Sequence, residues 1–246
     1  MTQNGIKVQN LVKKFGDITA VNDLSFEVNP GELFGLLGPN GAGKTTAINI
    51  MTGLLKPTKG TAFVGGFDIR NQAKEVRKLI GVAPQDPAYY PHLTGRENVE
   101  LFGNLHNLPK KVLKKRTDEL LELVGLVEGA TRKTGTYSGG MIRRISLVMG
   151  LINDPEIAFL DEPTVAMDPQ SRRATWSFVK DLKNREKTVV LTTHYIEEAE
   201  ALCDRVGIID AGKLIAFGTP QALMRGHNAE DLEGVFLEIT GRKIRE

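Results

Sequence analysis

The sequence predicts an α/β fold with a mostly parallel β-sheet, interrupted by a long helical insertion. Three observations predict it. Short apolar runs recur along the chain, each followed by turn residues and then a helical pattern. These runs are apolar without alternation, as in strands that helices cover on both faces. Helical spacing dominates from 86 to 153. The chain has 246 residues, 41% hydrophobic and 25% charged, which is typical of a folded globular protein.

The expected strands are five short runs at 33–37, 79–83, 157–160, 188–192 and 206–209. Between the second and third runs the chain is lysine-rich and helical in pattern, as in "PKKVLKKRTDELLELVGL", and no strand is expected there. No repeat, low-complexity tract or long flexible linker separates the parts. We therefore expect one compact unit with two lobes, the second formed by the helical insertion.

Charge and targeting signals exclude several classes of protein. A net charge of +2 is too small to indicate nucleic acid as the main partner. The single cysteine, Cys203, cannot form an internal disulfide, and "EALCDRV" places it in a helix core. No signal peptide and no apolar run of about 20 residues is visible. We expect a cytoplasmic chain that meets a membrane only through a partner.

The strongest chemical signal is "GLLGPNGAGKTT", in which residues 38–45 fit the pattern G-x-x-x-x-G-K-T between a strand-like and a helix-like run. Glycines let successive N–H groups point at phosphate oxygens, and the following helix adds the positive end of its dipole. Lys44 is expected to reach the β- and γ-phosphates, and Thr45 to bind a bridging Mg²⁺. The expected nucleotide-binding residues here are Gly38, Pro39, Asn40, Gly41, Ala42, Gly43, Lys44, Thr45 and Thr46.

An acidic pair follows the strand expected at 157–160. Asp161 is expected to hold the Mg²⁺, and Glu162 to polarise an attacking water as general base. Two acids that only cap a strand end are the alternative, and Lys44 upstream argues against it. Lys44 and Asp161 lie about 120 residues apart, whereas one βαβ step needs about 30. A sizeable segment is therefore inserted between the two motifs.

The insertion carries a second glycine-rich helix start in "TYSGGMIRRI". Apolar residues recur at helical spacing at Met141, Ile145, Val148, Met149 and Ile152. Arg143 and Arg144 are expected on another face. Ser138, Gly139 and Gly140 then lie at a helix start, where free N–H groups and a serine hydroxyl make a second anion site. On this stretch alone, an ordinary serine-capped helix stays the alternative.

In order and spacing, these motifs resemble the nucleotide-binding subunits of ABC transporters over nearly the whole chain. "GPNGAGKT" resembles the Walker A motif, "IAFLDEP" the Walker B motif with its catalytic glutamate, and "YSGGM" the signature motif. Gln85 in "GVAPQDP" matches the glutamine loop that contacts Mg²⁺ and senses the permease. Asp168 in "TVAMDPQSR" matches the D-loop, and His194 in "LTTHYIEEAE" the switch histidine that contacts the γ-phosphate. Phe15 in "KKFGDITAV" matches the aromatic residue that stacks on adenine.

The resemblance implies an ATPase that uses ATP and Mg²⁺. Its catalytic residues would be Lys44, Glu162 and His194, and its metal ligands Thr45, Gln85 and Asp161. The implied fold is a P-loop NTPase core with a small antiparallel β part and an inserted helical subdomain. One ABC ATPase domain would span 1–246, with a RecA-like core at 1–85 and 154–246, including the N-terminal β part, and the signature-bearing helical subdomain at 86–153.

The resemblance also implies partners. Two ATP-binding subunits, identical or paralogous, would meet head to tail, so that the signature motif of one covers ATP on the phosphate loop of the other. ATP would hold the pair closed, and hydrolysis would let it reopen and drive an integral-membrane permease. The chain would lie at the inner face of the cell membrane through that permease.

Several sequence details resemble those of the ABC-2 exporter group, which includes antibiotic-resistance, nodulation lipo-oligosaccharide and sodium exporters. Tyr137 and Met141 stand where leucine and glutamine are usual in the signature motif, and Ala166 and Met167 where glycine and leucine are common in the D-loop. "HYIEEAEALCDRVGIIDAGKLIAFGTP" and "LEGVFLEITGR" are similar to the same group. We therefore expect the chain to drive export, and we expect no nucleic-acid partner. A soluble ATPase of nucleic acid or ribosomes and a nutrient-importer ATPase are the alternatives.

The segment after the glutamine loop is a candidate docking site. Thr94 and Glu97 have the spacing of a capping box, which predicts a helix start. Tyr89 and Tyr90 precede it and could line a groove for a permease helix, or equally pack in the core. The lysines at 110–115 could touch acidic lipid, although such a cluster is more often a solvated helix face.

Overall fold

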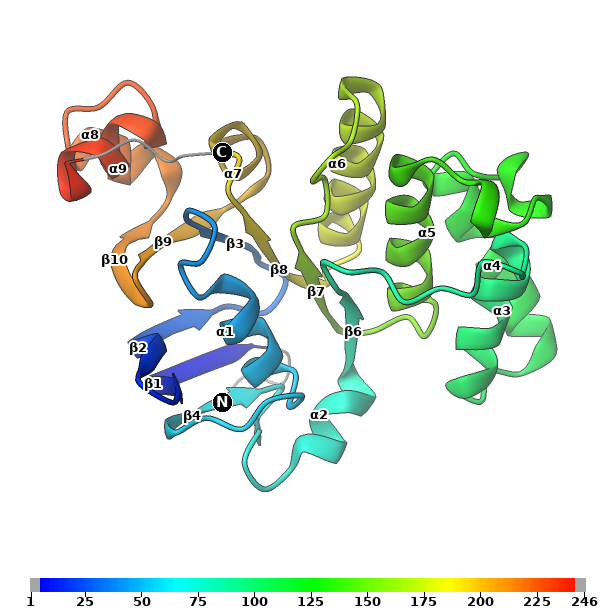
Figure 1. Ribbon diagram of the computed structural model, residues 1–246, viewed down its shortest axis with the longest axis horizontal. Helices are drawn as coiled ribbons and strands as arrows, with labels where there is room; N and C mark the ends of the chain where they lie inside the picture. Colours follow the sequence, from blue (N-terminus) through cyan, green and yellow to red (C-terminus); the bar gives the residue numbers. More distant parts are fainter. Residues whose placement is uncertain (1–4, 242–246) are drawn as a thin grey trace.

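The computed structural model describes residues 5–241, which form a six-stranded and a four-stranded sheet (Figure 1). The six-stranded sheet has the order β10-β9-β3-β8-β7-β6. In that order its strands are Lys213–Gly218, Arg205–Asp210, Leu33–Leu37, Thr188–Thr193, Ile157–Asp161 and Ile80–Ala83. All neighbours pair in parallel except β9 with β10. The predicted α/β fold with a mostly parallel sheet is confirmed.

The five expected strands all form, with small shifts at their ends. β6 begins at Ile80 and not at 79, because Leu79 is the last residue of helix α2 (Ala73–Leu79). β7 extends to include Asp161, so this acid is the last residue of its strand. A parallel sheet places the carboxyl ends of its strands at one edge, which is where ligands bind in this class of fold.

Burial on both faces of the sheet explains why its strands do not alternate. Within β3, Leu33 and Leu37 belong to one buried cluster, and Phe34 and Leu36 to the other. Helix α1 (Lys44–Met51) and the small sheet contribute to the second cluster. Helices α5 (Gly139–Leu151), α6 (Pro169–Asn184) and α7 (Ile196–Leu202) contribute to the first.

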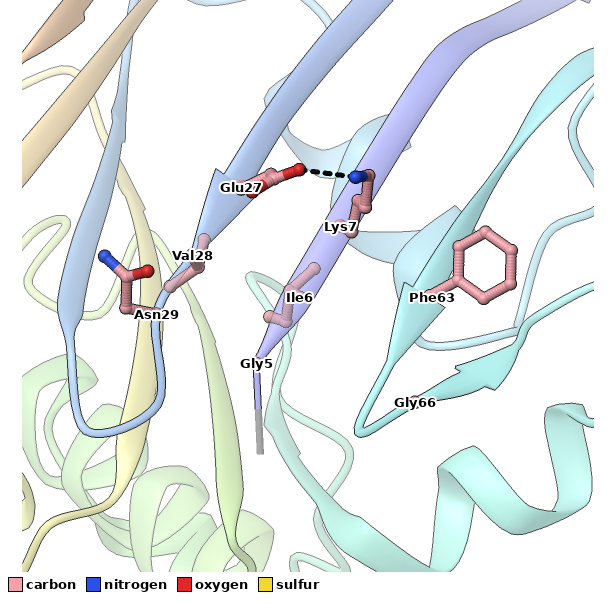
Figure 2. A pocket seen from close by; sticks show the side chains of 8 residues that line it. All are labelled: Gly5, Ile6, Lys7, Glu27, Val28, Asn29, Phe63 and Gly66. Carbon is pink, nitrogen blue, oxygen red and sulfur yellow. Dashed lines mark ion pairs between the residues drawn. The ribbon is translucent and has the colours of Figure 1, made fainter. Parts of the chain in front are cut away.

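The four-stranded sheet is antiparallel, with the order β2-β1-β4-β5, and confirms the small β part that the resemblance implies. Its strands in that order are Ile18–Val28, Ile6–Phe15, Lys59–Val64 and Phe67–Asp68. Figure 2 shows a hollow of about 250 Å³ at one end of β1, β2 and β4, where Lys7 and Glu27 form an ion pair of 2.7 Å. None of the residues predicted to bind nucleotide is among the described residues that line this hollow.

The segment predicted to be helical contains α3 (Gly95–Leu105), α4 (Lys110–Leu123) and α5, with short 3₁₀ turns at Gly129–Thr131 and Thr134–Thr136. Figure 1 shows this part, in green, on the side of the molecule opposite the small sheet. α3 starts with the predicted capping box: Glu97 N donates to Thr94 Oγ1 at 3.2 Å, and Thr94 N to Glu97 Oε2 at 2.7 Å. The domain boundaries at 86 and 153 stay a prediction.

The chain ends in α8 (Pro220–Gly226) and α9 (Leu232–Thr240). Residues 1–4 and 242–246 lie outside the described part, and with them the start of the region searched for a signal peptide and the last residue of "LEGVFLEITGR". Between 5 and 241 no helix is both long and apolar enough to cross a bilayer. Cys203 is buried as predicted, but it caps α7 in an extended conformation and is not inside the helix.

Candidate functional site

The glycine-rich segment forms the strand–turn–helix that its pattern predicts. β3 ends at Leu37, and α1 begins at Lys44 with Gly43 as its N-cap. Gly43 has φ 101°, and a Cβ atom placed there would lie 2.2 Å from the carbonyl oxygen of Ala20. Only glycine therefore fits at this position. The N–H groups at the start of α1 are free of side-chain caps, as an anion-binding helix start requires.

This loop lines a hollow of about 160 Å³. The lining residues are Ala20, Asn40, Gly41, Ala42, Gly43, Lys44, Thr45, Thr46, Gln85 and Glu162. Ala20 lies in β2, and Gln85 and Glu162 follow the ends of β6 and β7, so four segments that are distant in the sequence meet there. Gly38 and Pro39 accept hydrogen bonds from Lys44 Nζ through their carbonyl oxygens, at 2.7 and 3.1 Å. The predicted phosphate loop and acidic motif thus share one site.

Glu162 contacts both other residues predicted to be catalytic. Its Oε1 lies 3.1 Å from Lys44 Nζ, and its Oε2 lies 2.7 Å from His194 Nδ1. All three side chains are buried. Burial alone would raise the pKa of Glu162, but the hydrogen bond with His194 and the charge of Lys44 outweigh it and hold the pKa below its ordinary value. Glu162 is therefore a carboxylate with both oxygens engaged.

The backbone of Glu162 is held in the left-handed region, with φ 50°. A non-glycine residue keeps this strained conformation only where its surroundings enforce it. The N–H group of Glu162 donates to the carbonyl oxygen of Thr192 at 3.2 Å and to its Oγ1 at 3.0 Å. Thr192 Oγ1 in turn donates to the carboxylate of Asp161. β8 therefore fixes both Asp161, at the end of β7, and Glu162, which follows it.

The donors present fit a Mg²⁺ ion that accompanies phosphate. Thr45 and Gln85 line the hollow, and the buried Asp161 ends the adjoining strand. Among residues 5–241 no three or more His, Cys, Asp or Glu side chains gather where they could hold a metal by themselves. Mg²⁺ characteristically binds through one or two carboxylates together with waters and substrate phosphates. A hydroxyl, an amide and one carboxylate are suited to that mode.

The signature segment lies outside this hollow. Ser138 is the N-cap of α5, and its Oγ accepts from Met141 N at 3.3 Å, as the serine-cap pattern predicts. Ser138 and Gly139 are exposed. A Cβ atom placed on Gly140 would lie 3.5 Å from Ser171 Oγ, so this helix start adjoins the start of α6. None of the three predicted residues lines the hollow around the chain's own phosphate loop.

Two other predicted nucleotide contacts also lie apart from the hollow. Asp168 is the N-cap of α6, with its Oδ1 accepting from Gln170 N at 3.0 Å and Ser171 N at 2.9 Å. The hydrogen bonding to Ser171 lowers the pKa of Asp168. Phe15 ends β1 and is 48% exposed, with Lys13 Nζ 4.9 Å from its ring centroid. The nucleotide roles of both residues stay predictions.

The face of α5 that carries Arg143 is buried, although the helical pattern separates this residue from the apolar row as predicted. The side chain of Arg143 is buried and donates to the backbone carbonyls of Gln85 and Glu162, among others. A helical pattern assigns a charged residue to solvent by default. The residues one and two turns further along the same face are small or apolar: Leu147 is buried, and Gly150 lies against the backbone of Val82 in β6.

Glu198 is a second charged residue whose burial the sequence did not predict. Its Oε1 accepts from Thr164 Oγ1 at 2.8 Å and from Trp176 Nε1 at 3.0 Å. Burial raises the pKa of Glu198. It joins α7, which follows His194, to α6 and to the loop after Glu162. In the sequence it is one of several acids in "IEEAE", with nothing that marks it as buried.

Comparison with known proteins gives matches over most of the chain. A family model described as "ABC transporter" matches residues 21–165. A doxorubicin resistance ATP-binding protein of Mycobacterium tuberculosis is 46% identical over 94% of this chain and 68% of its own length. A Nod factor export ATP-binding protein of Burkholderia lata is 42% identical over 94% and 76%. A solved dimeric ATP-binding cassette, bound to ADP and Pi after hydrolysis, is 29% identical with a TM-score of 0.80, covering 87% and 98%.

Proposed function

Because this chain belongs to the ABC transporter family, we propose that it powers export by a separate membrane permease, through a pair of ATP-binding subunits that closes around ATP. The chain is an ATP-binding subunit and an ATPase. The observation that carries the proposal is the buried contact of Glu162 with Lys44 and His194 beneath the phosphate loop. Export is supported by the relatives, which are named for drug resistance and for Nod factor export.

The residues around Glu162 suggest how the site becomes active. When nucleotide binds, Lys44 would exchange its ion pair with Glu162 for phosphate oxygens, because Lys44 lines the same hollow as the phosphate loop. Glu162 Oε1 is then free to accept a proton from a water molecule, and loss of the adjacent positive charge raises the pKa of this carboxyl toward that of a useful base. His194 keeps hold of Oε2 and orients the carboxylate.

The remaining nucleotide contacts are assigned on the resemblance and on position. Thr45, Gln85 and Asp161 would hold Mg²⁺, which supplies charge neutralisation of the phosphates when bound. The exposed ring of Phe15 offers a stacking face for adenine. Gly38, Pro39, Asn40, Gly41, Ala42, Gly43 and Thr46 complete the phosphate cradle with their backbone.

A second ATP-binding subunit and a membrane permease are the partners of this chain. We assign the head-to-tail arrangement on the placement of the signature segment. Ser138, Gly139 and Gly140 form an anion site outside the chain's own hollow, so their nucleotide is the one on the opposite subunit. Asp168, beside Gly140, would face the same junction. Such isologous pairing makes two equivalent sites from two incomplete ones.

We assign the docking site of the permease to the face that carries Tyr90. Tyr90 is 56% exposed, and Asn98 fixes its backbone, with Tyr90 N donating to Asn98 Oδ1 at 2.8 Å. Tyr89 instead packs against the core. Tyr90 is therefore the candidate for docking, and Tyr89 fits the packing alternative. The lysines on α4 are exposed, and their contact with lipid stays a prediction. Neither alternative, the soluble nucleic-acid or ribosome ATPase and the importer, gains support from the relatives described above.

The head-to-tail assignment is tested by Ser138→Arg. The arginine side chain would project from the exposed helix start toward the opposite subunit and prevent closure, whereas ATP binding by the monomer should stay unchanged. Light scattering during size-exclusion chromatography, with ATP and Mg²⁺ present, is expected to show a monomer for this variant in a Glu162→Gln background. Ser177→Arg, at an exposed serine of α6, is the matched control and should still dimerise. A Ser138→Arg protein that dimerises as well as its control would reduce this segment to a capped helix.

A further inference from the structure

Arg143 connects the signature helix to the two loops that carry Gln85 and Glu162. It lies in the second turn of α5, and its side chain is 5% exposed. Nη1 donates to the carbonyl oxygen of Pro84 at 2.8 Å and to that of Gln85. Nη2 donates to the carbonyl oxygens of Asp161 and Glu162. One guanidinium therefore binds four backbone acceptors on two segments far apart in the sequence.

Burying this charge is costly, which argues against a role in packing alone. A buried guanidinium loses its hydration, and Arg143 Nε has no hydrogen-bond partner among the described residues. Burial lowers the pKa of Arg143, although the negative charges of Asp161 and Glu162 act in the opposite direction. An apolar side chain of similar volume often serves a core as well or better. The contacts made by the guanidinium are therefore its distinguishing feature.

The contacts with Asp161 and Glu162 hold a strained backbone in place. With φ 50°, Glu162 depends on its surroundings to keep its conformation. Thr192 binds the N–H side of Glu162, and Arg143 binds its carbonyl side. The direction of the Glu162 side chain follows from this backbone conformation. Loss of the Arg143 contacts therefore removes one of the restraints on the backbone of the proposed general base.

We propose that Arg143 is a positioning residue that makes the placement of Glu162 depend on the position of the signature helix α5. The same guanidinium fixes the backbone of Gln85, whose side chain lines the nucleotide hollow. A shift of α5 against the parallel sheet, produced at its exposed N-terminus by the second subunit, moves Arg143 and with it both loops. This inference rests on the proposed role of Glu162 and adds a route by which subunit closure controls hydrolysis.

The test compares Arg143→Gln, Arg143→Lys and Arg116→Gln. Arg116 is the matched control, because its guanidinium also donates to backbone carbonyls, those of Leu151 and Ile152 at the end of α5. For Arg143→Gln we expect kcat for ATP hydrolysis to fall about 10- to 100-fold, the scale set by a misplaced catalytic group. The dissociation constant for ATP should change less than about threefold, because the phosphate loop is untouched. Arg143→Lys should be intermediate, and Arg116→Gln should keep the parental kcat.

Hydrogen exchange separates positioning from general support of the fold. In Arg143→Gln, amide exchange should accelerate in peptides covering 81–88 and 158–165 together, with other segments unchanged. Arg116→Gln should leave both peptides as in the parent. Faster exchange throughout the chain, together with weaker ATP binding, would identify Arg143 as a structural brace and overturn the proposal. If Arg143→Gln does not fold, Arg143→Lys decides by the same two measurements.

The inference and the proposed function fail in distinguishable ways. Glu162→Gln at parental turnover would remove Glu162 from its role and the inference with it. Glu162→Gln without turnover, combined with Arg143→Gln at a kcat within twofold of the parent, would overturn the positioning role alone. Loss of turnover in both variants with ATP affinity retained is the result we expect.

Discussion

Glu162→Gln is expected to lower kcat for ATP hydrolysis by about 10²- to 10⁴-fold, the contribution typical of a general base. Glutamine has the same shape, so its amide can remain between Lys44 and His194, but it cannot accept the proton of the attacking water. The dissociation constant for ATP should stay near the parental value, because the phosphate loop is intact. Phosphate release and equilibrium nucleotide binding measure the two quantities separately.

The control for this variant is Glu122→Gln, which removes an exposed carboxylate from α4. It should hydrolyse ATP at the parental rate. Because Glu162→Gln retains ATP, it should also accumulate the closed dimer when ATP and Mg²⁺ are present. Turnover at the parental rate would show that another group activates the water, and Glu162 would keep only a structural role.

Lys44→Ala is expected to weaken ATP binding by at least about 10- to 100-fold, the value of one or more charge-assisted hydrogen bonds. The ammonium group of Lys44 is buried, points at the site and is held by the carbonyl oxygens of Gly38 and Pro39. No other lysine or arginine is among the residues that line the described hollow. Isothermal titration with ATP and Mg²⁺ measures the loss. Unchanged affinity would remove the phosphate-loop assignment.

The same substitution also leaves Glu162 without its cationic partner. A buried carboxylate that loses its ion pair typically costs the fold about 3–5 kcal/mol. Lys44→Ala should therefore unfold at lower temperature than the parent, and the double variant Lys44→Ala with Glu162→Gln should recover part of the loss. Lys115→Ala, at an exposed lysine of α4, controls for removal of charge and should change neither ATP affinity nor stability.

Local features of the site could be predicted from the sequence because they are short-range. A glycine turn between an apolar run and a helical run specifies its own geometry, and Gly43 adopts the positive φ that this turn needs. Ser138 and Thr94 cap helices where the patterns place them. The contact between Glu162 and His194 is different, because it depends on the parallel register of β7 and β8, with Asp161 opposite Thr192. Only the family resemblance related these two residues before the fold was known.

Buried charge is what sequence patterns could not predict here. Arg143 and Glu198 occupy helices in which polar residues are normally assigned to solvent, and each is instead buried with specific backbone or side-chain partners. Arg143 binds carbonyls on two segments, and Glu198 binds Thr164 and Trp176. Such contacts form between different helices, strands and loops, whereas the periodicity of apolar residues predicts the buried face of each element separately. Tertiary placement therefore decides the environment of these two residues.

The central claim is that this ATPase drives a membrane permease, and copurification tests it most directly. Tagged Glu162→Gln, extracted gently from its native cells with ATP and Mg²⁺ present, should hold the closed state and retain its partners for identification by mass spectrometry. We expect a membrane protein with several apolar spans, together with a second ATP-binding subunit. Recovery of ribosomes or nucleic acid with no membrane protein would contradict the claim and assign the chain to the soluble ATPases of its superfamily.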